Sequence, residues 1–321
     1  MVPGFSHLPG NHCGSTALRN LLAFHGVAIS EEMAFGLGAG ACFYYVTLED
    51  ASPTRWFNGR VARLEENFRE LTGAALQMRT FEPGEGAWEA ARAEVEAGRP
   101  ALLLTDLYYL DHYGRSAHFP GHAVVLAGYD GEHAYLSDTA FEELQTTRLE
   151  NLARARHGDH PAYPLQGHMF TAADGIDPAR LAAAVPAAVA RAAAEMLEPA
   201  FGEYAGLPAV RRLAAEAGGW PEQAEDWQWC ARFAYQVIER RGTGGGNFRL
   251  MYSRFLEEAG YADEAPLAHA AAGSWSELAE AFFAASEREE PEPGAWQRIA
   301  AAAAACAAAE ERLWGSLAER G

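Results

Sequence analysis

Hydrophobic positions follow two different patterns along the chain. Up to about residue 175, short stripes at helical spacing are followed by apolar runs typical of strands, whereas later residues form one Ala-, Glu- and Arg-rich helical pattern after another. The first stripe predicts a helix over residues 13–25 and consists of Ala17, Leu18, Leu21 and Leu22. Gly26 is placed to end this helix, because glycine readily adopts the left-handed backbone of a helix C-terminus.

The remaining pattern of the first part predicts helices before strands. Further helices are expected over residues 30–35, 60–71 and 88–98, the first capped by Ser30. From residue 100 the run ALLLTDLYYL predicts a strand, and HAVVLAGY and HAYLSD predict a hairpin. This order is typical of an α+β fold. We therefore expect an α+β domain over residues 1–175 and an all-α domain over residues 176–321.

The chain is strongly acidic. It has 44 Asp and Glu residues against 25 Lys and Arg residues, a formal net charge of −19. Since phosphate binding requires a positive surface, we expect no nucleic-acid partner. A negative potential would concentrate cationic amines near the protein. Solubility alone would also account for the charge, and the sequence leaves both explanations open.

Neither an export signal nor a membrane segment is evident. The N-terminal MVPGFSHLPG lacks a basic region followed by an apolar one, and no apolar stretch reaches the roughly 20 residues of a membrane span. The cysteines show neither C-x-x-C spacing nor a disulfide framework: Cys13, Cys42, Cys230 and Cys306. His118 and His122 lie across a proline without an obvious third ligand. We therefore expect a cytoplasmic location, no membrane partner and no metal.

One cysteine stands where a helix would activate it. Cys13 follows Asn11-His12 and opens the first predicted helix. Unpaired backbone N–H groups and the positive end of the helix dipole stabilise a thiolate there, and the same N–H groups can hold an oxyanion. A buried cysteine is also a common small hydrophobic residue, so position alone leaves its role open.

A histidine and an aspartate at the open end of the predicted hairpin could supply the base and the orienting carboxylate that a nucleophilic cysteine needs. With a loop of Asp130 to Glu132, Val124 pairs with Asp138, and His122 lies diagonally opposite Asp138 on the same face. A two-residue loop would put His122 and Asp138 on opposite faces. A carboxylate on one ring nitrogen fixes the tautomer of a catalytic imidazole, so the first register predicts a site with Cys13.

These segments resemble a known family. HCGSTALRNLLAFHG and HAVVLAGYDGEHAYLSD are similar to the papain-like fold of the family 39 cysteine peptidases. The chain more closely resembles the family named for butirosin biosynthesis protein H. Three segments carry that resemblance: Asn11-His12-Cys13, AFGLGAGACFYY and LLLTDLYYLDHY. Residues 240–260 also resemble the helical domain that often follows in this family.

The resemblance implies an N-acyltransferase with a papain-like catalytic domain. The founding member moves an aminoacyl group from a carrier-protein thioester to an aminoglycoside amine. By resemblance, Cys13 is the nucleophile, His122 the base and Asp138 the residue that orients it. We expect an acyl carrier protein or acyl-CoA donor, a small cationic amine acceptor such as an aminoglycoside or polyamine, no cofactor, and a role in antibiotic biosynthesis and secondary metabolism. A homodimer is left open.

The family 39 peptidases place an oxyanion-binding Gln six residues before the cysteine. In this chain that position is His7, and His12 directly precedes Cys13, so Asn11 is our candidate oxyanion donor with His12 beside it. Tyr44, after a glycine-rich turn, is expected to line the pocket.

Residues near the predicted strand end suit an amine. Two carboxylates would pair with the amine and three tyrosines would make cation–π contacts with it: Asp106 and Asp111, with Tyr108, Tyr109 and Tyr113. These residues are equally consistent with a packed strand end. Docking of an acidic carrier protein would need an arginine patch, for which Arg240, Arg241 and Arg249 are candidates.

Two other functions stay open from the sequence. A cysteine peptidase or amidase would use the same three residues with water as acceptor. A non-enzymatic binding module would keep the fold with a structural cysteine.

Overall fold

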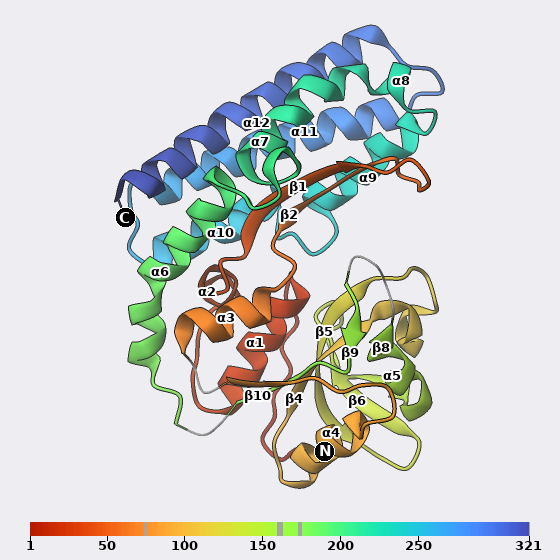
Figure 1. Ribbon diagram of the computed structural model, residues 1–321, viewed down its shortest axis with the longest axis vertical. Helices are drawn as coiled ribbons and strands as arrows, with labels where there is room; N and C mark the ends of the chain where they lie inside the picture. The colour runs from red at the N-terminus through yellow and green to blue at the C-terminus, as the bar shows by residue number, and fades with distance from the viewer. Residues whose placement is uncertain (74–75, 159–162, 173–174, 321) are drawn as a thin grey trace. The chain divides into compact units, whose positions relative to one another are not determined.

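The computed structural model describes residues 1–73, 76–158, 163–172 and 175–320. Its contacts define two compact units. Unit 1 comprises Met1–Ala34 and Ala62–Ala183, and unit 2 comprises Phe35–Val61 and Ala184–Gly321. The predicted α+β class is confirmed, because a region with a central sheet precedes a helical region (Figure 1).

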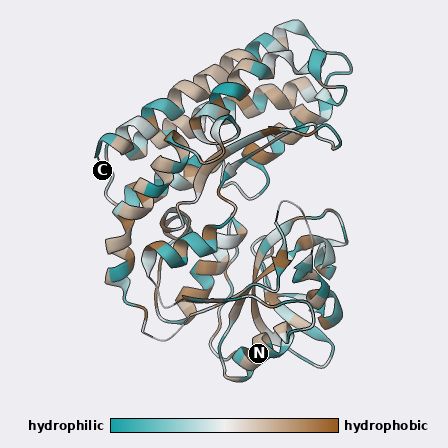
Figure 2. Cartoon of the chain, in the orientation of Figure 1, coloured by the Kyte–Doolittle hydropathy of each residue, from teal (hydrophilic) through white to brown (hydrophobic). Residues whose placement is uncertain are grey.

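A six-stranded antiparallel sheet forms the centre of unit 1. Its spatial order is β3 (Leu76–Arg79), β10 (Met169–Ala172), β4 (Ala101–Asp106), β5 (Pro120–Tyr129), β6 (His133–Ser137) and β7 (Gln145–Arg148). Every residue of β4 is buried, and its first four residues, ALLL, are apolar, as expected for a strand at the centre of a sheet. Figure 2 shows hydrophobic residues along the central strands of this sheet.

Helices and short turns complete unit 1. They are α1 (Cys13–Phe24), α3 (Leu64–Thr72), α4 (Ala87–Glu96), α5 (Leu149–Ala155), the 3-10 helices η1 (Leu107–Tyr109) and η2 (Asp111–Tyr113), and the short strands β8 (His157–Gly158) and β9 (Leu165–Gln166). Helix α1 packs against β4, β5 and β10. Helices α4 and α5 contribute Ala91 and Leu152 to a core with Leu103, Val124 and Leu136.

Most predicted helices of the first part are confirmed. The apolar stripe of α1 is buried, and Gly26 follows the helix with φ +80°. Ser30 accepts a hydrogen bond from Met33 N at the start of α2 (Glu31–Leu37). The predicted helix over residues 60–71 is wrong at its start. Arg60 ends a strand, and the helix begins only at Leu64.

The β5–β6 hairpin reaches the predicted register by a different route. Tyr129 pairs with Ala134, and Asp130 N donates to His133 O, so the connection is tighter than the expected loop. An irregularity between Leu126 and Gly128 then shifts the register, so that Val125 pairs with Ser137. A bulge adds one residue to one strand, and here it restores the face relationship that the longer loop would have given.

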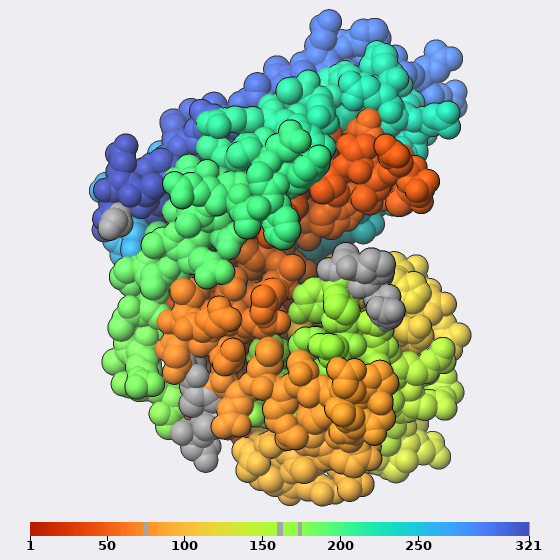
Figure 3. Space-filling view, in the orientation of Figure 1, coloured from red at the N-terminus to blue at the C-terminus, as the bar shows by residue number. Residues whose placement is uncertain are grey.

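Among its described residues, unit 2 is helical apart from one hairpin. Its elements are β1 (Ala41–Thr47), β2 (Arg55–Arg60), η3 (Gly202–Tyr204), α7 (Gly206–Glu216), η4 (Ala217–Gly219), α8 (Trp220–Gln223), α9 (Trp227–Glu239), α10 (Arg249–Glu258), α11 (Glu264–Ser286) and α12 (Pro293–Arg320). Helix α6 (Pro178–Leu197) spans the change from unit 1 to unit 2. The hairpin of β1 and β2 was not predicted from the sequence. Strand β1 packs beside α7 (Figure 3), and β2 packs beside α9. The expected domain over residues 1–175 therefore does not coincide with unit 1, because residues 35–61 belong to unit 2.

A buried ion pair lies inside unit 2. Arg249 Nε contacts Glu310 Oε1 at 2.7 Å, and both side chains are 0% exposed. Glu310 also accepts hydrogen bonds from the indoles of Trp275 and Trp314. Arg249 Nη1 donates at 2.8 Å to the carbonyl oxygens of Cys42 and Gly59, one on each strand of the hairpin. Arg249 is thus a structural anchor, and the proposed arginine patch is wrong at this residue.

No helix among the described residues is both long enough and apolar enough to cross a membrane.

We expect Arg249→Met to destabilise unit 2 by about 3–5 kcal/mol, because it leaves the Glu310 charge buried without its partner. Arg211→Met is the matched control, since Arg211 Nε contacts Glu311 Oε1 at the same 2.7 Å but with side chains 58% and 45% exposed. Such exposed pairs contribute little. Urea unfolding followed by tryptophan fluorescence reports mainly on unit 2, and equal losses in the two variants would contradict this assignment.

Candidate active site

Cys13 is the first residue of α1, and its side chain is partly exposed. His12 caps the helix with an extended backbone, and its Nδ1 accepts a hydrogen bond of 3.3 Å from Ser15 N. Thr16 N donates to His12 O at 2.9 Å, which closes the first helical turn. The cysteine therefore lies at the positive end of the helix dipole, as the sequence predicted.

A buried carboxylate holds the backbone before the cysteine. Glu31 is 5% exposed and accepts hydrogen bonds from Asn11 N at 2.9 Å and His12 N at 2.7 Å. Ser15 Oγ donates to the same carboxylate. The turn after the cysteine is also crowded, because a Cβ at Gly14 would lie 2.2 Å from Glu65 Oε1. These contacts fix the loop that presents Cys13.

His122 stands on β5 beside a bulge. It pairs with Thr105 on β4, whose hydroxyl donates to His122 O at 2.9 Å. The register shifts at the next pair, where Gly121 has φ +84°. A side chain would strain this left-handed backbone, so glycine suits the position. Bulges commonly redirect side chains next to active sites.

The structure brings His122, Asp138 and Cys13 together within unit 1. His122 Nε2 lies 2.9 Å from Asp138 Oδ2, and Asp138 is 0% exposed. Burial alone would lower the pKa of His122, but the Asp138 carboxylate and a hydrogen bond with Cys13 together raise this pKa to about 10. Because Asp138 occupies Nε2, Nδ1 is the ring nitrogen left for the thiol. The Asp138 carboxylate thus favours the protonated, imidazolium form of His122 beside Cys13.

The other thiols have a different environment. Burial raises the pKa of Cys42 to about 11, and it also raises the pKa of Cys230 and of Cys306. Each of these cysteines lies in unit 2 and is buried. Since only the thiolate is strongly nucleophilic, they are poor nucleophiles.

Two further residues contact Asp138, and the sequence did not predict these contacts. His112 Nε2 lies 3.0 Å from Asp138 Oδ2, and Tyr113 OH donates to Asp138 Oδ1 at 3.0 Å. Both belong to the 3-10 helix η2, which is too short to produce a periodic pattern. Burial and the nearby Asp138 charge raise the pKa of Tyr113, so its hydroxyl stays a donor.

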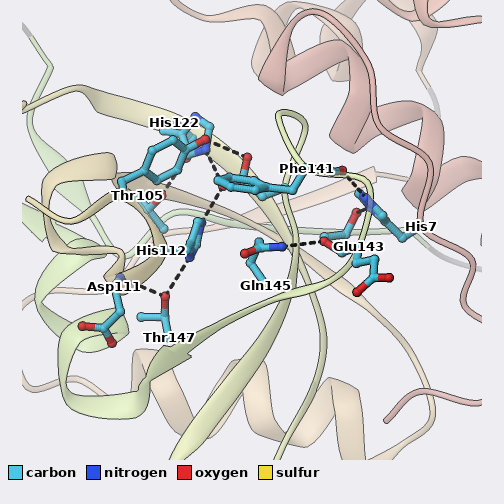
Figure 4. A network of polar contacts seen from close by, with 12 residues as sticks. His7, Thr105, Asp111, His112, His122, Phe141, Glu143, Gln145 and Thr147 are labelled. Carbon is cyan, nitrogen blue, oxygen red and sulfur yellow. Dashed lines mark hydrogen bonds and ion pairs between the residues drawn. The ribbon is translucent and has the colours of Figure 1, made fainter. Parts of the chain in front are cut away.

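The residues expected near the oxyanion have partners of their own. His7 contacts Ser137 Oγ at 2.7 Å through Nδ1 and Phe141 O at 2.8 Å through Nε2 (Figure 4). The Asn11 amide donates to Glu31 Oε2 at 3.3 Å. His7 therefore ties the N-terminal loop to the strand end that carries Asp138.

The carboxylates expected to bind an amine are also occupied. Asp106 accepts from Tyr108 N and Phe119 N and contacts His118 Nδ1 at 2.6 Å. Asp111 accepts from Arg148 N at 2.8 Å and from the Asn151 amide at 2.6 Å.

The two expected tyrosines lie in different units. Tyr108 stacks on His118, with ring centroids 4.0 Å apart. Tyr44 lies on β1 in unit 2, where burial and the adjacent Cys42 raise its pKa.

The three histidines of this region contact two different aspartates. His112 and His122 contact Asp138, whereas His118 contacts Asp106.

Fold and site together define an α+β domain with a cysteine–histidine–aspartate cluster, followed by a helical domain. Residues 12–139 match the family described as butirosin biosynthesis protein H, N-terminal, and residues 150–317 match a domain of unknown function (DUF4872). The chain belongs to this family of butirosin biosynthesis protein H-like proteins with a C-terminal helical domain. Among curated proteins, none matches the chain.

We expect iodoacetamide at pH 6–7 to label Cys13 well before the other three cysteines, because thiolate character controls the rate. Peptide mass spectrometry at short times would locate the label. His122→Ala should slow labelling of Cys13 without speeding that of Cys42. Comparable labelling of all four cysteines in the folded protein would contradict the assignment of Cys13.

Proposed function

We propose that this protein is an N-acyltransferase that forms an acyl-thioester intermediate on Cys13. The observation that carries the proposal is a hydrogen-bonded series that runs from Cys13, at the start of α1, through His122 on β5 to Asp138 directly after β6. Membership in the family of butirosin biosynthesis protein H supports the proposal that the protein is an enzyme of antibiotic biosynthesis. A papain-like catalytic domain is part of this proposal.

In the first half-reaction, the Cys13 thiolate attacks the carbonyl carbon of a thioester donor. The carbon–sulfur bond of the donor breaks, and its leaving thiolate takes the proton of the His122 imidazolium. Neutral His122 and acyl-Cys13 remain. Backbone N–H groups of Cys13 and Gly14 at the helix start would stabilise the oxyanion, because they lie at the positive end of the dipole.

In the second half-reaction, a neutral amine attacks the acyl carbon. His122 accepts a proton from the attacking nitrogen, the bond to Cys13 breaks, and the thiolate–imidazolium pair is restored with release of an amide. Asp138 keeps His122 oriented and stabilises its positive charge in both halves. Neither half-reaction requires a cofactor.

We propose an acyl carrier protein or acyl-CoA as the donor and an aminoglycoside or polyamine-like amine as the acceptor. Arg240 and Arg241 are exposed in unit 2 and stay candidates for contact with an acidic carrier. With Asp106 and Asp111 engaged by other residues, the overall charge of −19 is the remaining argument for a cationic acceptor. A cytoplasmic location also stays a prediction.

Intact-mass analysis with acetyl and aminoacyl N-acetylcysteamine thioesters tests the intermediate. We expect an adduct of the acyl mass on the wild type and none on Cys13→Ala. His122→Ala should lower the acylation rate by about 10³-fold or more, and Asp138→Asn by less, because the orienting acid is usually the least critical member of such a group. A Cys13→Ala protein that still acquires the acyl mass would overturn the proposal.

Spermidine as a probe acceptor tests amine transfer. Amide formation should rise with pH up to the pKa of the attacking amine, since only the neutral amine attacks. Added salt should raise the apparent KM for spermidine, because screening over about 10 Å at 0.1 M weakens electrostatic steering. β-Alanine, whose carboxylate cancels the attraction, is the control and should show no such salt effect. Free acid as the product with every amine would identify a hydrolase instead.

A further inference from the structure

Asp138 carries more hydrogen bonds than the proposed reaction requires. One oxygen, Oδ2, lies 2.9 Å from His122 Nε2 and 3.0 Å from His112 Nε2, while Oδ1 accepts from Tyr113 OH. Burial would raise the pKa of Asp138, but the charge of His122 and the hydrogen bonds from both histidines keep it well below its ordinary value. The carboxylate is therefore an anion shared by two imidazoles.

His112 is built into place on the far side of that carboxylate. Its Nδ1 lies 3.2 Å from Thr147 Oγ1, which also accepts from Asp111 N (Figure 4). Its ring meets Phe141 edge-on, with centroids 5.2 Å apart, and the side chain is only 5% exposed. Since the Thr147 hydroxyl can donate to Nδ1, neutral His112 can carry its proton on Nε2 and donate it to Asp138.

A second donor changes how the carboxylate acts on the first. An oxygen that accepts two hydrogen bonds has both lone pairs directed, so the carboxylate cannot rotate away from His122. The second bond also withdraws negative charge, which weakens the hold of the carboxylate on the imidazolium. A more weakly held proton is easier for His122 to give to a leaving thiolate.

We propose that His112 is a positioning residue, which fixes the Asp138 carboxylate behind His122 and limits how strongly that carboxylate holds the His122 proton. The consequence for catalysis rests on the proposed acyl transfer, whereas the effect on His122 does not. The titratable groups around this carboxylate are Cys13 from α1, His112 and Tyr113 from η2, and His122 from β5. Asp111 is paired with Arg148 and Asn151 instead.

The test follows the titration of His122 by NMR of ¹³Cε1-labelled histidine, between pH 8 and 10.5. His112→Phe removes the donor but keeps a ring against Phe141, and His112→Gln keeps an amide donor. We expect the His122 midpoint to rise by about half a pH unit or more in His112→Phe and to stay near wild type in His112→Gln. Asp138→Asn is the control and should lower the midpoint, because the opposing charge is lost.

Acylation by the thioester probes gives the second measurement. His112→Phe should slow adduct formation by about tenfold, with recovery in His112→Gln. An unchanged or lowered His122 midpoint in a folded His112→Phe protein would overturn the inference. A raised midpoint in a protein that forms no adduct with any thioester would uphold the inference and count against the proposed function.

Discussion

A fully buried carboxylate is stable only where donors surround it, and unit 1 is arranged to satisfy this requirement at Asp138. The donors come from different parts of the chain: His122 from a central strand, and His112 and Tyr113 from a short 3-10 helix. Two irregularities of β5, one beside Gly121 and one near Gly128, set the positions of His122 and Asp138. These irregularities of the sheet thus allow His122 to donate a hydrogen bond to the Asp138 carboxylate.

The sequence predicted the parts of this site that depend on periodicity. The buried stripe of α1 located Cys13 at a helix start, and the alternating strands located His122 and Asp138 near each other. The register was obtained for the wrong reason, since the prediction used a longer loop and the chain uses a bulge. The local sequence pattern does not predict this bulge, because the bulge offsets a short turn several residues away. The contact of His112 with Asp138 was missed for a similar reason, because the position of His112 depends on tertiary contacts with Thr147 and Phe141.

The two units stabilise buried carboxylates by contrasting means. Glu310 in unit 2 receives its hydrogen bonds from an arginine and two tryptophans, whose donors keep their protons at any ordinary pH. Asp138 in unit 1 receives them from two histidines and a tyrosine, groups that can exchange protons. The first arrangement can only hold the fold. The second can hold the fold and also respond to chemistry at the neighbouring thiol.

The hairpin of β1 and β2 has a consequence for how this gene can be divided. The chain enters unit 2 after Ala34, returns after Val61 and enters it again after Ala183. Phe43 and Phe57 of the hairpin pack on Trp275, with ring centroids 5.1 and 6.5 Å away. A fragment ending near residue 175 would therefore encode an aromatic hairpin without the helix that covers it, and such an exposed apolar strand pair invites aggregation. The part of the chain that carries Cys13 and the helical part consequently cannot be separated by a single truncation, because the hairpin would have to be rebuilt.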